Sequence, residues 1–525
     1  MSIPAFTRWS AVEGYCAPLS FAPGEAVPVH CSSRVDRFAV TVTLVGAERT
    51  VVWSRDDLTA AEQPFPEDAW RTGCGWPATF TITTDPSWPS GFYEVRFDAV
   101  GGEAGDPRSV GEAFFVLRPP VDGPRKPSLL ILSTNTYNAY NQWGGRCLYT
   151  GAEALSFERP IERGYLRRPA APFEVDFDGR IANVDTPSDP EHLRLQAYQH
   201  EHDWPLLTAS AGWHNWERRF VRWAQLAGFE FDVAINSDLD VHPEVLDGHR
   251  LVLSVGHDEY WSWGMRDAMD DFVERGPAGG GGNWVILSGN TAFWQVRYED
   301  DGRTMVCHKG SARRNDPVRG GPDQHLLTSM WSDPLIARPE NSTTGLSFTR
   351  GGYHRVGHGV PLGAGAYTVH RPDHWAFADT GVCYGDQLGA GSFVVGYEVD
   401  GCAFDTVNRL PVPTGEDGTP TDLEILGTCP ARLHSITDDR CEAPAAIWAS
   451  VDPPGDLEGV SMVLFGDAEP ENVARVAHGH AVMASFRRGA GTVFNGGSAD
   501  WAYGLDRDPL VQQVTANVIR HLGGV

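Results

Sequence analysis

The chain has 525 residues, which allows two to four domains and a large hydrophobic core. Its formal net charge of −27 at pH 7 argues against nucleic acid or an anionic membrane surface as a partner. The nine cysteines include no Cys-x-x-Cys pair, so we expect reduced thiols and no zinc–thiolate site. The chain shows neither a signal-peptide pattern nor an apolar run long enough to cross a membrane, so we expect a cytoplasmic protein without a membrane span.

Short β-type runs separated by turns make up the N-terminal part of the chain. Residues 37–45 and 91–97 are two examples, each rich in β-branched and aromatic side chains. Because runs at this spacing are typical of a small antiparallel sandwich, we predict an immunoglobulin-like β-sandwich over residues 1–122. Its residues do not suggest catalysis, and we expect the sandwich to cover or position the domain that follows.

Apolar strands alternate with polar loops and helices in the rest of the chain, which predicts an α/β catalytic domain over residues 123–525. Repeated alternation of this kind is typical of a doubly wound fold, a parallel sheet with helices on both faces. Between about residues 311 and 450, β-type pieces lie among Gly- and Pro-rich loops and indicate a β-rich insertion with its own β structure. Ligands bind at the carboxyl edge of such a sheet. Four loops that follow apolar strands are expected to meet there: residues 134–146, 256–262, 288–294 and 495–501.

The loop after residues 251–255 has the highest density of ionisable groups. Gly256 interrupts the apolar run, and His257, Asp258 and Glu259 follow at once. In extended geometry His257 and Glu259 are two residues apart and point to the same side. A simpler interpretation is a capped helix start with Asp258 as the N-cap, since a helical pattern follows.

Several catalytic motifs are missing from the sequence. We find no Gly-x-Ser-x-Gly elbow at a strand end, no phosphate-binding Gly-x-x-x-x-Gly-Lys segment and no dinucleotide fingerprint. The polar residues that remain are His, Glu, Asp, Asn, Lys and several Tyr, a set that suits metal-activated water or acid–base catalysis. Phenolates and carboxylates are hard oxygen ligands and match a ferric-type ion better than a zinc–thiolate site.

Five separated segments of the α/β part occur in the order known from one family: residues 135–146, 254–261, 289–297, 338–340 and 495–501. Together they resemble the large subunit of N,N-dimethylformamidase and its relatives, over about residues 128–525. The resemblance implies a glutamine-amidotransferase-like core and an amidohydrolase for small non-peptide amides. It further implies one mononuclear ferric ion (Fe3+) held by two tyrosines and one glutamate, and a small accessory subunit. We also expect a homo-oligomer.

The resemblance assigns the metal ligands only in part. It places the glutamate on Glu259 and one tyrosine on either Tyr137 or Tyr140. Tyr165 is the nearest candidate for the second tyrosine. Each of these tyrosines has an alternative role as an aromatic wall residue.

The resemblance also indicates catalytic residues: His257, Asn290, Lys309 and Glu398. His257 suits proton transfer near neutrality because an unperturbed histidine has a pKa of about 6.5. The alternatives are a turn cap for Asn290, a surface lysine for Lys309 and a solvated strand face for Glu398. The expected aromatic walls of the substrate pocket are Trp143, Trp261, Trp294 and Trp501.

Two other function classes stay open on the sequence alone. One is a non-amide or metal-free hydrolase on the same scaffold, since a fold does not determine a reaction. The other is a carbohydrate- or ligand-binding protein that uses tryptophan-rich surfaces without catalysis. Bound iron would discriminate between these classes, because a tyrosine-ligated ferric ion is visibly coloured.

Overall fold

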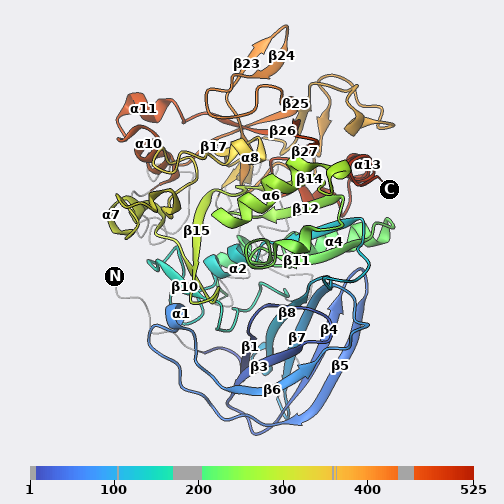
Figure 1. Cartoon of the computed structure of the whole chain (residues 1–525), viewed down its shortest axis with the longest axis vertical. Helices are drawn as coiled ribbons and strands as arrows, with labels where there is room; N and C mark the ends of the chain where they lie inside the picture. Colours follow the sequence, from blue (N-terminus) through green and yellow to red (C-terminus); the bar gives the residue numbers. More distant parts are fainter. Residues whose placement is uncertain are drawn as a thin grey trace, which may run out of the picture.

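The computed structural model describes residues 8–102, 106–168, 204–356, 360–361, 363–435 and 455–524. Figure 1 shows the N-terminal sandwich at one end of the molecule and the α/β body above it. Within the described part of the chain, no helix combines the length and the apolar composition needed to cross a bilayer.

The N-terminal part consists of two packed sheets. The larger has strand order β2-β8-β7-β4-β5 and the smaller β1-β3-β6. Val40 and Val95 of the larger sheet and Val27 and Val29 of the smaller one are fully buried in the same core, because alternate strand residues face inward. The strands are β1 (Val12–Cys16), β2 (Ser20–Phe21), β3 (Ala26–Ser33), β4 (Phe38–Val45), β5 (Arg49–Leu58), β6 (Ala78–Thr83), β7 (Gly91–Ala99) and β8 (Val110–Leu117), with the short helix α1 (Ala69–Thr72) between β5 and β6.

A nine-stranded sheet with order β11-β9-β12-β14-β27-β26-β25-β20-β21 forms the centre of the α/β body. Its first five strands are parallel to one another, and the other four pair antiparallel. The parallel strands are β9 (Ser128–Leu132), β11 (Phe231–Ile235), β12 (Leu251–His257), β14 (Asn283–Gly289) and β27 (Gly491–Asn495). The others are β20 (Tyr367–Val369), β21 (Gln387–Leu388), β25 (Glu424–Ala431) and β26 (Gly479–Arg488).

Helices cover both faces of this sheet (Figure 1). On one face, Leu253 and Val255 of β12 share a hydrophobic cluster with Phe220 of α4 and Val514 of α13. On the other face, Val252 belongs to a second cluster with residues of α6. The helices of the body are α2 (Thr134–Tyr140), α4 (Glu217–Leu226), α5 (Asp238–Val241), α6 (Trp263–Arg275), α7 (Ala312–Asn315), α8 (Asn341–Thr344), α10 (Asp456–Phe465), α11 (Pro470–Ala474), α12 (Trp501–Gly504) and α13 (Pro509–Gly523).

The central sheet differs from the expected parallel sheet in its second half. Two residues connect β26 to β27, and a connection this short joins only antiparallel neighbours. Strands β20, β21 and β25 come from the expected insertion and extend the central sheet, while the insertion's other strands pair with each other outside that sheet.

Short strands outside the central sheet complete the body. The four-stranded sheet has order β10-β16-β15-β13, and β17 pairs antiparallel with β22. The strands are β10 (Ala154–Ser156), β13 (Tyr260–Ser262), β15 (Trp294–Glu299), β16 (Thr304–Val306), β17 (Ser347–Gly352), β18 (Arg355–Val356), β19 (Val360–Pro361), β22 (Val399–Gly401), β23 (Phe404–Val407) and β24 (Leu410–Pro413).

Candidate active site

Polar side chains converge where β9, β12 and β14 end. His257 is the last residue of β12 and is paired with Gly289 of β14, so the residues after both strands lie side by side. Gly256 has φ of 87°, and a Cβ there would come within 2.7 Å of the Trp216 side chain, so both the backbone conformation and the close approach require glycine. The strand therefore ends in a tight, buried turn that directs His257 and Glu259 into one site.

The fourth loop, residues 495–501, positions a side chain without contributing one to the cluster. The backbone amide of Ala499 donates to the carbonyl of Glu398 at 2.9 Å, and Val399 forms a β-bridge with Ser498. The Asp500 carboxylate accepts a hydrogen bond from the amide of Tyr397 at 2.8 Å. These contacts hold Glu398, which comes from the inserted segment, over the edge of the central sheet.

His257, Glu259 and Glu398 form the centre of the site. Nε2 of His257 lies 3.2 Å from Oε2 of Glu259 and is also in ion-pair contact with Oε2 of Glu398. One ligand atom from each of the three residues lies within 4.8 Å of the other two. The three residues are 1–2% exposed, so these charges are held away from solvent. Asp258 does not cap the following helix: the N-cap of α6 is Ser262, and Asp258 accepts a hydrogen bond from Asn236.

Two phenols contact the Glu259 carboxylate. The Tyr140 hydroxyl donates to Oε2 at 3.2 Å, and the Tyr149 hydroxyl lies 3.0 and 2.9 Å from the two carboxylate oxygens. The two hydroxyls are 2.6 Å apart. Tyr149 follows the motif in residues 135–146 by only a few positions, but no local pattern distinguished it, and sequence reasoning missed it. The Glu259 carboxylate and the two phenol oxygens thus lie within hydrogen-bond distance of one another.

The structure does not bring the other two candidate tyrosines to Glu259. The Tyr137 hydroxyl donates to Glu217 at 2.6 Å, and its ring faces Phe114 of the sandwich. Tyr165 is fully buried, and its hydroxyl has no hydrogen-bond partner among the described residues. Of the three candidate tyrosines, only Tyr140 lies at the site.

Asn290 and Lys309 both lie at the site in left-handed backbone conformations, with φ of 53° and 51°. Nδ2 of Asn290 donates to Glu398 at 3.1 Å, and its backbone amide is held by Asp400 at 2.9 Å. Nζ of Lys309 donates to the Tyr260 hydroxyl at 3.0 Å and lies 3.5 Å from the ring centre of Tyr149. Lys309 is 7% exposed and Glu398 2%, so neither is a solvated surface residue.

Two further residues reach the cluster from segments in which the sequence gave no functional signal. The Tyr353 hydroxyl lies 2.9 Å from Oδ2 of Asp456 and 3.4 Å from Oε1 of Glu398. Burial, followed by the charge of Glu398, raises the pKa of Asp456 to about 7, although hydrogen bonding to Tyr353 opposes the shift. Neither residue follows a strand of the parallel sheet, which explains why a search of strand ends missed both.

The electrostatics of the site stabilise charge on His257 and Glu259. Burial disfavours the charged imidazolium of His257 and lowers its pKa. The negative charges and hydrogen bonds of Glu398 and Glu259 outweigh this effect and raise the pKa well above its ordinary value. Burial alone would raise the pKa of Glu259, yet His257, Lys309 and Tyr149 hold it below the ordinary value. Burial and then Glu259 raise the pKa values of Tyr140 and Tyr149, so without a bound cation their hydroxyls stay protonated and act as donors.

Only one of the four expected wall tryptophans lies at this site. The ring centre of Trp294 is 4.9 Å from Nζ of Lys309. Trp261 packs on Trp284 in the core, and Nε1 of Trp501 donates to Thr515 of α13. Trp143 packs edge-on or tilted against the rings of Trp76 and Phe65 in the N-terminal part of the chain. Sequence reasoning missed Trp216, whose ring lies 6.1 Å from the His257 ring and whose Nε1 donates to Asp500.

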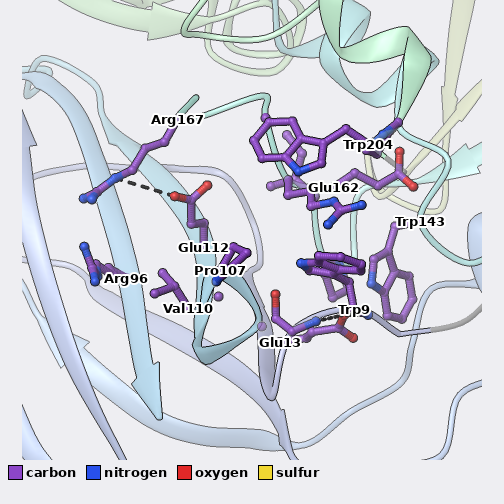
Figure 2. A pocket seen from close by; sticks show the side chains of 18 of the residues that line it. Trp9, Glu13, Arg96, Pro107, Val110, Glu112, Trp143, Glu162, Arg167 and Trp204 are labelled. Atoms are coloured by element: carbon purple, nitrogen blue, oxygen red, sulfur yellow. Dashed lines mark hydrogen bonds and ion pairs between the residues drawn. The ribbon is translucent and has the colours of Figure 1, made fainter. Parts of the chain in front are cut away.

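A separate cavity of about 440 Å³ lies between the sandwich and the α/β body (Figure 2). Trp9, Trp143 and Trp204 line it together with Glu112 and Arg163. The Arg163 guanidinium already lies 3.2 Å above the Trp9 ring, and Figure 2 shows Arg167 reaching Glu112 on the sandwich side. No residue of the His257 cluster is among the described residues that line this cavity, so it is distinct from the candidate active site.

Comparison with known proteins gives a consistent result. The profile of the family described as N,N-dimethylformamidase beta subunit-like, C-terminal, matches residues 40–516. The N,N-dimethylformamidase beta subunit of Alcaligenes sp is 26% identical over 284 residues, which are 52% of this chain and 34% of that protein. The protein of the same name from Paracoccus aminophilus is 25% identical over 241 residues, 44% of this chain and 29% of its own length. The matched part of this chain thus spans about a third of the length of these curated relatives.

Proposed function

Because this chain belongs to the N,N-dimethylformamidase beta subunit-like family, as the match over residues 40–516 shows, we propose that it hydrolyses the C–N bond of small carboxamides. The observation that carries this proposal is the convergence of the Tyr140 and Tyr149 hydroxyls on the Glu259 carboxylate, beside a His257–Glu398 pair. A buried set of oxygen donors next to a potential acid and base suits metal-assisted hydrolysis.

We propose that Glu259, Tyr140 and Tyr149 hold a single ferric ion. Carboxylate and phenolate oxygens are hard ligands of the kind that this ion prefers. The positive charge of a bound cation would reverse the electrostatics around the phenols, because it favours their deprotonated forms. When bound, the ion would supply Lewis-acid polarisation of the amide carbonyl. Tyr149 then takes the place that Tyr165 had in the sequence-based assignment.

His257 and Glu398 are suited to the two proton transfers of the reaction. Nδ1 of His257 is committed to the Ser210 carbonyl at 2.7 Å, so proton exchange occurs at Nε2, which faces Glu398. In this mechanism Glu398 takes a proton from the attacking water as the oxygen–carbon bond forms. Nε2 of His257 gives its proton to the amine nitrogen as the C–N bond breaks, and proton exchange with Glu398 restores both groups.

Lys309 and Asn290 are placed to stabilise negative charge on the carbonyl oxygen. Each has donor hydrogens beyond the one that binds Tyr260 or Glu398. A donor directed at a developing oxyanion contributes roughly 3 kcal/mol to transition-state stabilisation. Trp294 lies beside Lys309 and Trp216 beside His257, and such aromatic surfaces favour a small, weakly polar substrate over a charged one.

The test combines metal analysis with activity. We expect protein purified after growth with iron to contain about one equivalent of it, to show a ferric–phenolate absorption band, and to release amine from at least one formamide or acetamide. Iron-loaded protein that binds metal but turns over no amide would favour a non-amide hydrolase. Protein that retains neither iron nor activity would favour a carbohydrate- or ligand-binding role.

We also propose that the chain works in an assembly. The two curated relatives are named as beta subunits, and this supports both a smaller accessory subunit and self-association. Light scattering on the purified chain would show a multiple of the 57.4 kDa protomer if it self-associates. A monomer with full amidase activity would contradict a requirement for either partner.

A further inference from the structure

A row of hydrogen-bonding groups leads from His257 to a partly exposed carboxylate. His257 contacts Glu398, the Tyr353 hydroxyl lies 3.4 Å from the other oxygen of Glu398, and the same hydroxyl lies 2.9 Å from Oδ2 of Asp456. His257, Glu398 and Tyr353 are 1%, 2% and 8% exposed, whereas Asp456 is partly exposed at the beginning of α10. The buried pair is therefore connected through one phenol to the outer end of the row.

The backbone determines the position of Tyr353 in this row. Gly352 of β17 is paired with Val399 of β22, and the antiparallel register places the next residue, Tyr353, opposite Glu398. Tyr353 also exchanges two backbone hydrogen bonds with Arg432, at 2.8 and 3.0 Å. Two neighbouring segments thus fix the backbone of Tyr353, so its ring cannot follow Glu398 if that carboxylate moves.

The position of Asp456, on the other side of the Tyr353 hydroxyl, is fixed by the start of α10. Asp456 is the first residue of α10, and the amide of the next residue, Leu457, donates to the carbonyl of His434 at 3.1 Å. His434 packs beside the Tyr353 ring, with ring centres 5.1 Å apart. The helix start, the segment around residue 434 and the tyrosine are therefore one packed unit.

We propose that Asp456 and Tyr353 are positioning residues, in which Asp456 orients the Tyr353 hydroxyl and that hydroxyl holds Glu398 against His257. A phenol has a single proton, so the Tyr353 hydroxyl can donate to Glu398 when the Asp456 carboxyl in turn donates to the phenol oxygen. Without Asp456, Tyr353 keeps its aromatic packing, but its hydroxyl loses the partner that directs its proton to Glu398. Glu398 then has only Asn290 and His257 among the partners described here to define its orientation. This role for Asp456 is geometric, because it requires a hydrogen-bond donor at that position and no negative charge.

The contact with His257 can be tested without any assumption about the substrate. Metal-free protein labelled with 15N at histidine reports the imidazole nitrogen chemical shifts, and the His257 signals are assigned by their loss in His257→Gln. We expect Tyr353→Phe and Asp456→Ala to move the Nε2 shift, and Asp456→Asn, which keeps a hydrogen-bond donor, to leave it close to the wild-type value. Asp405→Asn, on the exposed strand β23, is the control and leaves it unchanged.

Activity provides a second measurement, which rests on the proposed function. We expect Tyr353→Phe and Asp456→Ala to lower kcat for an amide roughly ten-fold to a hundred-fold, with little change in KM, and Asp456→Asn to recover most of it. An unchanged Nε2 shift in the conservative Tyr353→Phe variant would overturn the inference. Equal shifts in the Ala and Asn variants would overturn the geometric role of Asp456. If Nε2 shifts as expected but the wild type hydrolyses no amide, the proposed function fails and the positioning role stands.

Discussion

The backbone carbonyl of Ser210 accepts a hydrogen bond from Nδ1 of His257 at 2.7 Å. Because a carbonyl cannot donate, Nδ1 carries the proton, and a neutral His257 has its lone pair on Nε2. The Ser210 carbonyl, 47 positions away in the sequence, therefore fixes the tautomer of His257. Nε2 faces Glu259 and Glu398. This relationship leaves Nε2 as the ring nitrogen that faces Glu398 and exchanges a proton with it.

Substitution of Glu259 should remove the metal without unfolding the protein. Glu259→Gln keeps the side-chain volume but loses the anionic oxygen between Tyr140 and Tyr149. We expect iron content to fall at least ten-fold, as measured by elemental analysis, while the circular dichroism spectrum is retained. Glu299→Gln, on the exposed end of β15, is the matched control. Iron content equal to that of the wild type would exclude Glu259 as a ligand.

The two phenol ligands should be distinguishable from the other buried tyrosines by absorption spectroscopy. We expect Tyr140→Phe and Tyr149→Phe each to shift or abolish the ferric–phenolate band, because each removes a hydroxyl next to Glu259. Tyr137→Phe and Tyr165→Phe should leave the band unchanged, since these hydroxyls do not reach Glu259 in the structure. A band lost in Tyr165→Phe but retained in Tyr149→Phe would reverse the assignment.

His257→Gln should lower kcat roughly 10²- to 10⁴-fold while the metal stays bound, because general acid–base groups contribute about this factor. Gln can still donate to a neighbouring carbonyl, but it does not exchange a proton with Glu398. The measurement is the release of amine by protein whose iron content equals that of the wild type. Undiminished turnover in this variant would remove His257 from the mechanism.

Stability should depend on Glu112, which lies where the sandwich meets the α/β body. Burial raises its pKa to about 7 from an unfolded value of about 4.5, although Arg96 and Arg49 oppose the shift. The folded state therefore binds more protons between these pH values, so stability is highest at the acidic end and is lost as pH rises through about 7. We expect Glu112→Gln to raise Tm by about 1–3 °C at pH 8.

The same variant should show little difference from the wild type near pH 4, where Glu112 is protonated in both states. Glu48→Gln, an exposed glutamate of the sandwich, provides the control for the loss of one negative charge. Thermal unfolding followed by calorimetry at both pH values checks the prediction. A Glu112→Gln variant that is less stable at pH 8 would show that the ion pair with Arg167 outweighs burial.

The family and part of the site could be identified from the sequence. The family assignment, made from five short segments, is confirmed by the match over residues 40–516. Short-range pattern was sufficient for the strands, because an apolar β-branched run such as residues 251–255 is buried wherever it lies in a sheet. The same short-range pattern indicated the turn at Gly256 that places His257 and Glu259 together, because the glycine and the two side chains lie within four consecutive residues.

Only the tertiary structure decided which distant residues meet these two. Tyr149 reaches Glu259 because the chain folds back after α2, while Tyr137, three residues before Tyr140 in that helix, turns to Glu217. Trp261, Trp294 and Trp501 all occur in segments that follow apolar strands. Trp294 lies at the site beside Lys309, whereas Trp261 and Trp501 are core residues.

Glu398 and its partners depend most strongly on long-range pairing. Glu398 is held by the pairing of β17 with β22 and by the loop after β27, and Tyr353 and Asp456 reach it from two further segments. The sequence indicated the apolar strands of the parallel half of the sheet and the polar residues that follow them, because these depend on neighbours within a few residues. The composition of the site depends on contacts between residues 45 to 108 positions apart, and only the packed sheet and its crossovers specify those.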